Sequence, residues 1–153
     1  MSEPIEHPPI LIVDEQEKLL RLVAMLMSRI GFPDVDGVSS GPEALEKMRQ
    51  RRYALVISDL NMEPMDGLSL LREIRGDDTL MNTPFILTES SFDFEDINLA
   101  HQAGADAFIL KPFDIAVLKN KLKQVINRKP RKREAPIATQ STLEQEFPML
   151  GKY

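Results

Sequence analysis

Short apolar runs and helical patterns alternate along the first 127 residues of the chain. Apolar and β-branched segments predict five strands, at residues 10–13, 35–38, 54–58, 85–88 and 107–110, of which 35–38 is the weakest. Apolar residues at three- and four-residue spacing predict five helices, at 17–31, 41–52, 66–76, 94–105 and 114–127. Every predicted strand is therefore followed by a predicted helix.

This strict alternation predicts an α/β fold with a parallel sheet covered by helices on both faces. Four of the five strands are apolar along their whole length, as expected for strands that are buried on both sides. Right-handed crossovers leave few topologies, and we expect a doubly wound five-stranded parallel sheet of order 2-1-3-4-5.

Composition narrows the class of protein. The chain has 153 residues, of which 42% are hydrophobic, enough for one domain and a modest tail. No apolar run approaches the roughly 20 residues that span a bilayer, and the N-terminus lacks signal-peptide features. The absence of cysteine excludes disulfides and fits a reducing compartment. A net charge of −5 argues against general nucleic-acid binding. We therefore expect a cytoplasmic protein.

The composition changes after residue 127. We expect a flexible N-terminus at residues 1–8, one domain at 9–127, and a flexible basic and polar tail at 128–153. A basic run fills residues 128–133, and Ser141 with Glu144 forms a possible capping box that could fold on a partner. About 25 residues are too few for an effector domain, so we expect no DNA-binding domain.

Acidic side chains follow the two strands between which the strand order reverses. Asp14 and Glu15 come directly after the first strand, and Asp59 follows the third. Ligands of such sheets bind outside the carboxyl ends of the strands, near this reversal. Closely packed carboxylates repel one another unless a cation lies between them. Oxygen-only ligands in a wet site favour Mg²⁺.

A lysine follows the fifth strand and adds a positive charge at the same edge. A carboxylate beside Mg²⁺ and the ammonium of Lys111 can act as a nucleophile toward a phosphoryl group. The two cations would neutralise the charge that spreads over the transferring oxygens. The sequence therefore predicts phosphorylation on aspartate.

The segments "ILIVDE", "LVISDLNMEPMDG" and "AGADAFILKPF" resemble the receiver domains of two-component response regulators, over roughly residues 9 to 127. The resemblance implies a flavodoxin-like receiver fold in which Asp59 is the phosphoacceptor and Lys111 binds a phosphoryl oxygen. It also implies a Mg²⁺ site made of Asp14, Glu15, Asp59 and the backbone carbonyl of Asn61. The peptide bond before Pro112 is expected to be cis.

Three positions depart from the family pattern. Glu15 replaces the more usual second aspartate, and the proline of the loop after the third strand, Pro64, comes one place late. Glu89 falls where receivers carry the serine or threonine that binds the phosphoryl group. Thr88 could take that place only through a local bulge, because strand side chains alternate between faces.

The resemblance also implies residues that transmit the signal. Ser90 is the small residue that lets phosphodonors reach the aspartate, and Phe108 is the switching aromatic or a simple packing residue. A carboxylate cannot donate a hydrogen bond unless it is protonated, so Glu89 has two interpretations. Either it turns outward and phosphorylation proceeds with altered switching, which we favour, or it pairs with Lys111 and holds an altered conformation.

The most consistent hypothesis is a single-domain, CheY-like response regulator, a signalling protein that catalyses only its own phosphorylation and dephosphorylation. Its phosphodonor would be a histidine kinase or a phosphotransfer protein. Its target would bind the face of the helix at 94–105, the strand at 107–110 and the helix at 114–127, and the chain would be a monomer or weak dimer.

Three alternatives remain at this stage. A phosphorylation-independent docking module is made credible by Glu89. A Mg²⁺-dependent phosphatase with an aspartyl nucleophile would need a second aspartate after Asp59, where Leu60 and Asn61 stand instead. A flavin or dinucleotide binder would need a glycine-rich loop after the first strand, where the sequence is "DEQEKLL".

Overall fold

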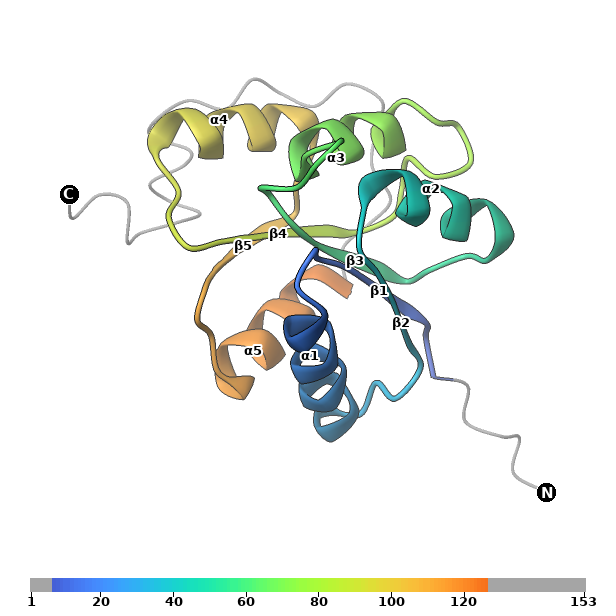
Figure 1. Cartoon of the computed structure of the whole chain (residues 1–153), viewed down its shortest axis with the longest axis vertical. Helices are drawn as coiled ribbons and strands as arrows, with labels where there is room; N and C mark the ends of the chain where they lie inside the picture. Colours follow the sequence, from blue (N-terminus) through green and yellow to red (C-terminus); the bar gives the residue numbers. More distant parts are fainter. Residues whose placement is uncertain (1–6, 127–153) are drawn as a thin grey trace.

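The computed structural model describes residues 7–126, in which five strands and five helices alternate (Figure 1). In chain order they are β1 (Ile10–Val13), α1 (Glu17–Ile30), β2 (Val35–Val38), α2 (Gly41–Gln50), β3 (Leu55–Asp59), α3 (Gly67–Arg75), β4 (Phe85–Glu89), α4 (Phe94–Ala103), β5 (Ala107–Leu110) and α5 (Ile115–Ile126). The predicted order of elements is confirmed, including the weak strand β2.

The five strands form one parallel sheet of order β2-β1-β3-β4-β5, as the sequence predicted. The order reverses between β1 and β3, which are direct neighbours. In register, Asp59 at the end of β3 lies opposite Thr88, and Glu89 at the end of β4 lies opposite Leu110. The polar residues that follow the strands are therefore collected at one edge of the sheet.

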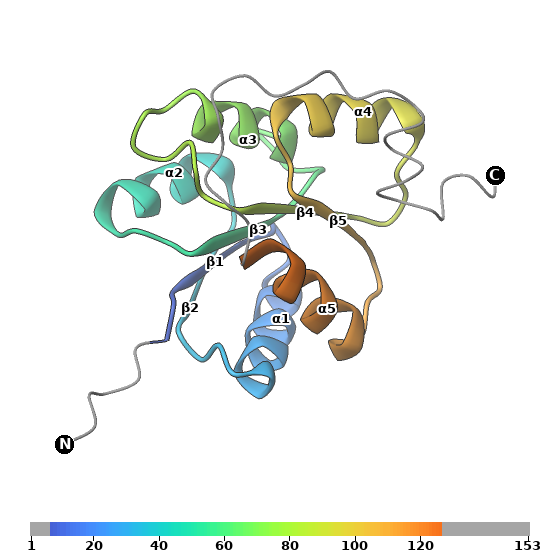
Figure 2. The same ribbon diagram turned by 180° about the vertical axis from the view of Figure 1, so that it is seen from behind.

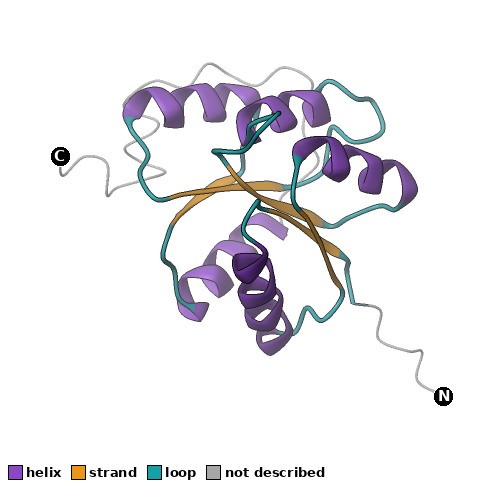
Figure 3. Cartoon of the chain, in the orientation of Figure 1, coloured by secondary structure: helices purple, strands orange, loops and turns teal. Residues whose placement is uncertain are grey.

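Helices cover both faces of the sheet, with α2, α3 and α4 on one side and α1 and α5 on the other (Figures 1 and 2). Figure 3 shows the strands as a single layer between these two groups of helices. Alternate residues of each strand enter alternate cores: Leu11 and Phe108 belong to the core under α2–α4, whereas Ile12 and Ile109 belong to the core under α1 and α5. The fully apolar strands are explained by this double burial.

All five helices of residues 7–126 begin and end within two residues of their predicted limits, several of them at identifiable caps. Gly31 and Gly104 adopt φ values of 121° and 99°, which favour glycine, and they end α1 and α4. The side chain of Asp66 accepts a hydrogen bond from Ser69 N–H at 2.7 Å and begins α3. Asp114 likewise accepts from Val117 N–H at 2.9 Å before α5.

Two strands extend one residue beyond their predicted ends. Asp59 is the last residue of β3, and Glu89 is the last residue of β4. Strand pairing therefore fixes the backbone of both acidic residues, which the sequence placed at the ends of these strands. The predicted N-terminal segment lies largely outside the described residues, and the tail at 128–153, with its basic run and capping box, lies wholly outside them. Among the helices of residues 7–126, none is long and apolar enough to cross a bilayer.

One buried arginine ties together the opposite edge of the domain. The guanidinium of Arg75, at the end of α3, donates to the backbone carbonyls of Met81, Thr83 and Gly104 at 2.6 to 3.1 Å. It also forms an ion pair with Asp106 at 3.2 Å, and both side chains are largely buried. The same carboxylate of Asp106 accepts the N–H of Phe85, the first residue of β4. This network fixes the entry to β4 and β5.

Replacing Arg75 by methionine should destabilise the domain by about 3–5 kcal/mol, because it removes a largely buried ion pair with Asp106 and the hydrogen bonds to three backbone carbonyls. Urea unfolding monitored by circular dichroism measures this change. Arg72 is a matched control on the same helix, since its side chain is exposed, and Arg72→Met should change stability by less than about 0.5 kcal/mol. Equal losses in the two variants would contradict the role given to the network.

Candidate functional site

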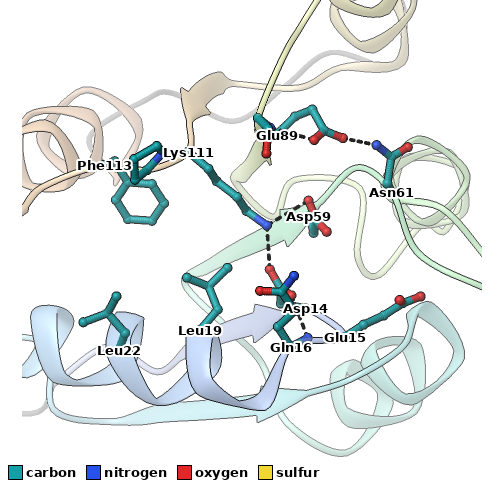
Figure 4. A pocket seen from close by; sticks show the side chains of 12 residues that line it. Asp14, Glu15, Gln16, Leu19, Leu22, Asp59, Asn61, Glu89, Lys111 and Phe113 are labelled. Carbon is teal, nitrogen blue, oxygen red and sulfur yellow. Dashed lines mark hydrogen bonds and ion pairs between the residues drawn. The ribbon is translucent and has the colours of Figure 1, made fainter.

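A cavity of about 500 Å³ opens at the carboxyl edge of the sheet (Figure 4). Its wall combines acidic, basic and apolar side chains from the ends of β1, β3, β4 and β5 and from the first turns of α1. The lining residues are Asp14, Glu15, Gln16, Leu19, Leu22, Asp59, Asn61, Glu89, Ser90, Lys111, Pro112 and Phe113. All the candidate site residues except Phe108 thus meet in one place, as the topology predicted.

The ammonium of Lys111 lies between two buried carboxylates. It is 2.9 Å from Asp14 Oδ2 and 3.1 Å from Asp59 Oδ1. Through these two ion pairs, Asp14, Asp59 and Lys111 form one compact group although they are far apart in sequence. The other oxygen of Asp14 accepts a hydrogen bond from the N–H of Gln16 at 2.8 Å. The peptide bond before Pro112 is cis, as expected, and so is the bond between Glu63 and Pro64.

The electrostatic environment of Asp59 is unusual. Burial raises the pKa of Asp59 above its ordinary value; the contacts with Lys111 lower it, and the charges of Asp14 and Glu89 raise it again, leaving a net increase. Burial alone would lower the pKa of Lys111, but its pairs with Asp14 and Asp59 outweigh burial and raise it. Asp59 is therefore a carboxylate with too little positive charge around it, whereas Lys111 stays firmly protonated.

Glu15 faces away from this group, toward the loop that follows β3. Its carboxylate accepts a hydrogen bond from the N–H of Glu63. Glu15 and Asn61 also line a second cavity of about 450 Å³, together with Met62, Glu63, Pro64, Asp66 and Ser69. Glu15 thus lines both cavities.

Glu89, not Thr88, contributes to the cavity wall. The register of β4 runs without a bulge from residue 85 to residue 89, and Thr88 is buried elsewhere, with 4% of its surface exposed. The carboxylate of Glu89 accepts the N–H of Ser90 at 2.6 Å and a hydrogen bond from the side-chain amide of Asn61. No ion pair joins Glu89 to Lys111 in the structure of residues 7–126.

Phe108 does not line the cavity but lies in the core, with 6% of its surface exposed. Its ring packs edge-on against that of Phe92, with centroids 5.2 Å apart and an interplanar angle of 78°. Phe92 belongs to the connection between β4 and α4, so the aromatic pair links this connection to β5. Sequence patterns did not point to Phe92, apart from its aromatic character.

Sequence reasoning also missed Gly67, the first residue of α3. A Cβ atom at this position would clash with the backbone oxygen of Asp59 and with the side chain of Leu87. The N–H of Gly67 donates to the carbonyl of Leu60 at 2.8 Å, which draws the helix start against the end of β3. The adjacent Asp66 cap was the only available signal that the chain turns back here.

The donor set fits a hydrated divalent cation. Four carboxylates line the first cavity, of Asp14, Glu15, Asp59 and Glu89, against the one ammonium of Lys111. In the described part of the chain, no three acidic or histidine side chains converge closely enough to form a ready-made metal cluster. Mg²⁺ needs no such cluster, because it binds through one or two carboxylates and keeps several waters. The buried, charge-deficient Asp59 is the strongest sign of such a fit.

Comparison with known proteins gives one consistent answer. The model of the response regulator receiver domain matches residues 10–123. Chemotaxis protein CheY-3 of Vibrio cholerae is 35% identical over 119 residues, which are 78% of this chain and 92% of the relative.

Solved structures agree. That of Vibrio cholerae CheY4 has a TM-score of 0.75 at 26% identity and covers 78% of this chain and 99% of its own. The receiver domain of a sensor histidine kinase from Pseudomonas aeruginosa, described with magnesium coordinated in its active-site cleft, has a TM-score of 0.73 at 25% identity and covers 80% and 100%.

Replacing Asp59 by asparagine should stabilise the metal-free protein at neutral pH. Because its folded-state pKa is raised, the native state holds the Asp59 proton more tightly than the unfolded state, and wild-type stability falls as pH rises above about 3.8. The advantage of Asp59→Asn should therefore be full at pH 7 and fade as pH falls through the raised pKa. Urea unfolding in EDTA across this range measures it.

Asp77 is a control residue whose pKa is shifted in the opposite direction to that of Asp59. Hydrogen bonds from the side chain and backbone of Thr79 lower the pKa of Asp77 below its ordinary value. Asp77→Asn should therefore lose stability at pH 7 relative to wild type, and the loss should shrink as pH falls. An Asp59→Asn variant with the same pH trend as Asp77→Asn would contradict our account of the site.

Proposed function

The chain belongs to the response regulator receiver domain family of two-component signalling, and we propose that it is a cytoplasmic phosphoacceptor that takes a phosphoryl group on Asp59. The donor would be a histidine kinase or a phosphotransfer protein. The observation that carries this proposal is the placement of the Lys111 ammonium between Asp14 and Asp59 in an open cavity at the reversal of strand order.

In the proposed reaction, an Asp59 carboxylate oxygen attacks the phosphorus of a phosphohistidine. A P–O bond to Asp59 forms, the P–N bond to the donor histidine breaks, and the histidine takes up a proton. Lys111 remains positively charged and stabilises the negative charge of the transferring oxygens. Asp14, Glu15, Asp59 and the backbone carbonyl of Asn61 would hold Mg²⁺, which supplies further positive charge at the same oxygens.

The remaining residues of the cavity wall would control how a phosphodonor reaches Asp59. Ser90 is small enough to leave a donor's path to Asp59 open, and it lines the cavity. Leu19, Leu22 and Phe113 form an apolar flank beside the acidic group (Figure 4). The reaction consumes the protein's own side chain, so we propose no catalytic turnover on other substrates.

The output would be protein binding at the face made of α4, β5 and α5. Phosphorylation adds roughly two negative charges next to Glu89, which cannot bind them as a hydroxyl would. The signal would pass through the contact of Phe108 with Phe92, which connects β5 to the segment before α4. Phe94, Leu110 and Val117, partly exposed on these elements, would meet the target.

Neither earlier interpretation of Glu89 fits the structure as it was stated. The side chain does not turn outward, because only 9% of the residue is exposed and its carboxylate is bonded to Asn61 and Ser90. It also makes no ion pair with Lys111 within residues 7–126, so we propose that phosphorylation proceeds with altered switching while Glu89 keeps this position. Because Glu89 cannot donate a hydrogen bond to a phosphoryl group as a hydroxyl does, it is also compatible with a docking module that works without phosphorylation. The experiments below separate these two functions.

Incubation with acetyl phosphate and Mg²⁺ should add one phosphoryl group of about 80 Da, because the small donor reaches Asp59 through the cavity. Intact-mass spectrometry detects the adduct. Asp59→Asn and wild type in EDTA should both remain unmodified. Wild-type protein that is folded but unmodified by this donor and by a panel of phosphorylated histidine kinases would favour the docking module.

At a Mg²⁺ concentration that saturates both proteins, replacing Glu89 by threonine should speed phosphorylation, since it removes a buried carboxylate that repels the incoming phosphoryl group. We expect an increase of several-fold in the rate of adduct formation, measured by quenched time points and intact mass. Ser91→Thr, at an exposed residue that does not line the cavity, is the matched control and should leave the rate unchanged. Equal rates in wild type and Glu89→Thr would remove the repulsive role.

A further inference from the structure

We propose that Glu89 is a positioning residue for the cation site. Through its hydrogen bond with the side-chain amide of Asn61, it fixes the segment whose backbone carbonyl the cation would use. This inference rests on the proposed function only in taking that edge of the sheet to bind Mg²⁺. It gives a role in the metal-free protein to a residue that cannot serve as a phosphate-binding hydroxyl.

Glu89 is itself held firmly. One carboxylate oxygen accepts the N–H of Ser90 at 2.6 Å and the other accepts from Asn61, while only 9% of the residue is exposed. Its backbone carbonyl accepts the N–H of Lys111 at 2.9 Å. A charged acceptor with both oxygens bonded in a buried position has little freedom to turn, so it can serve as a fixed reference point.

The chain next to Asn61 is anchored on both sides. Immediately before it, the N–H of Leu60 donates to the carbonyl of Thr88 at 2.9 Å. Two residues after it, the N–H of Glu63 donates to Glu15. The Asn61 carbonyl lies between these anchors, and the side-chain bond to Glu89 is the third point that restricts its rotation.

Figure 4 shows the consequence for the site. Glu89 and Asn61 face each other on one side of Asp59, whereas Lys111 approaches Asp59 from the other side and meets Asp14. Lys111 therefore offsets the negative charge of Asp14 and Asp59, whereas the Glu89–Asn61 pair would orient the backbone carbonyl of Asn61. Mg²⁺ demands near-octahedral oxygen geometry, so a carbonyl held in one orientation should give a higher Mg²⁺ affinity than a mobile one.

Outer contacts that orient metal ligands typically change affinity by about 10- to 100-fold. Glu89 also contributes a negative charge, which would attract a cation without any hydrogen bond. The two effects can be separated because Asn61→Ala removes the hydrogen bond but keeps the backbone carbonyl and the charge of Glu89.

The test is a double-mutant cycle on Mg²⁺ affinity, measured by titration calorimetry on the full chain without any phosphodonor. Glu89→Ala should weaken binding by about 10-fold in the wild-type background. In the Asn61→Ala background the same change should weaken it by about threefold or less, because only the charge effect remains. An equal loss in both backgrounds would overturn the proposal.

Two further variants guard the interpretation. Glu89→Gln retains an oxygen that can accept from Asn61 and should bind Mg²⁺ more tightly than Glu89→Ala; if it binds as weakly, charge or direct ligation explains the effect and the proposal fails. Glu63→Gln removes a charge from the same loop and should show no coupling with Asn61→Ala.

A readout without metal completes the experiment. In the metal-free protein, the side-chain amide protons of Asn61 should exchange slowly with solvent by NMR and become fast-exchanging in Glu89→Ala. Fast exchange already in wild type would contradict the proposal. If wild type shows slow exchange but no Mg²⁺ binding, the proposed function fails instead, so the two failures are distinguishable.

Discussion

The cavity depends on the charge balance set by a single ammonium group. Lys111 makes ion pairs with Asp14 and Asp59, two buried carboxylates that would otherwise repel each other across the neighbouring ends of β1 and β3. Even so, Asp59 retains a raised pKa, because burial and the charges of Asp14 and Glu89 exceed what one lysine offsets. A site that is incompletely neutralised in this way is suited to gaining further positive charge.

The fold could be predicted because its signals are local and repeated. Strands that are apolar along their whole length indicated burial on both faces, and the structure places alternate residues of β1 and β5 in two separate cores. The meeting of Asp14, Asp59 and Lys111 followed from topology alone, since parallel strands end at the same edge. Helix limits followed from Gly31, Gly104 and the aspartate caps.

The partners of the acidic side chains could not be predicted in this way. Glu89 and Asn61 are 28 positions apart, and either could have bonded to several groups around the cavity. The turn of Glu15 toward Glu63 depends on how the loop after β3 closes, and that loop is shaped by the close approach of Gly67 to Asp59. Such choices arise from packing over a few ångströms, which residue spacing does not encode.

The edge-on pair of Phe92 and Phe108 has a thermodynamic consequence for any target of this receiver. The pair joins the connection between β4 and α4 to β5, which belongs to the proposed target face. If phosphorylation changes the arrangement of the two rings and thereby the affinity for a target, the target must, by reciprocity, shift the phosphorylation equilibrium by the same factor. The target would then be an effector of phosphorylation as well as its reader, and the equilibrium level of modified protein would depend on target concentration.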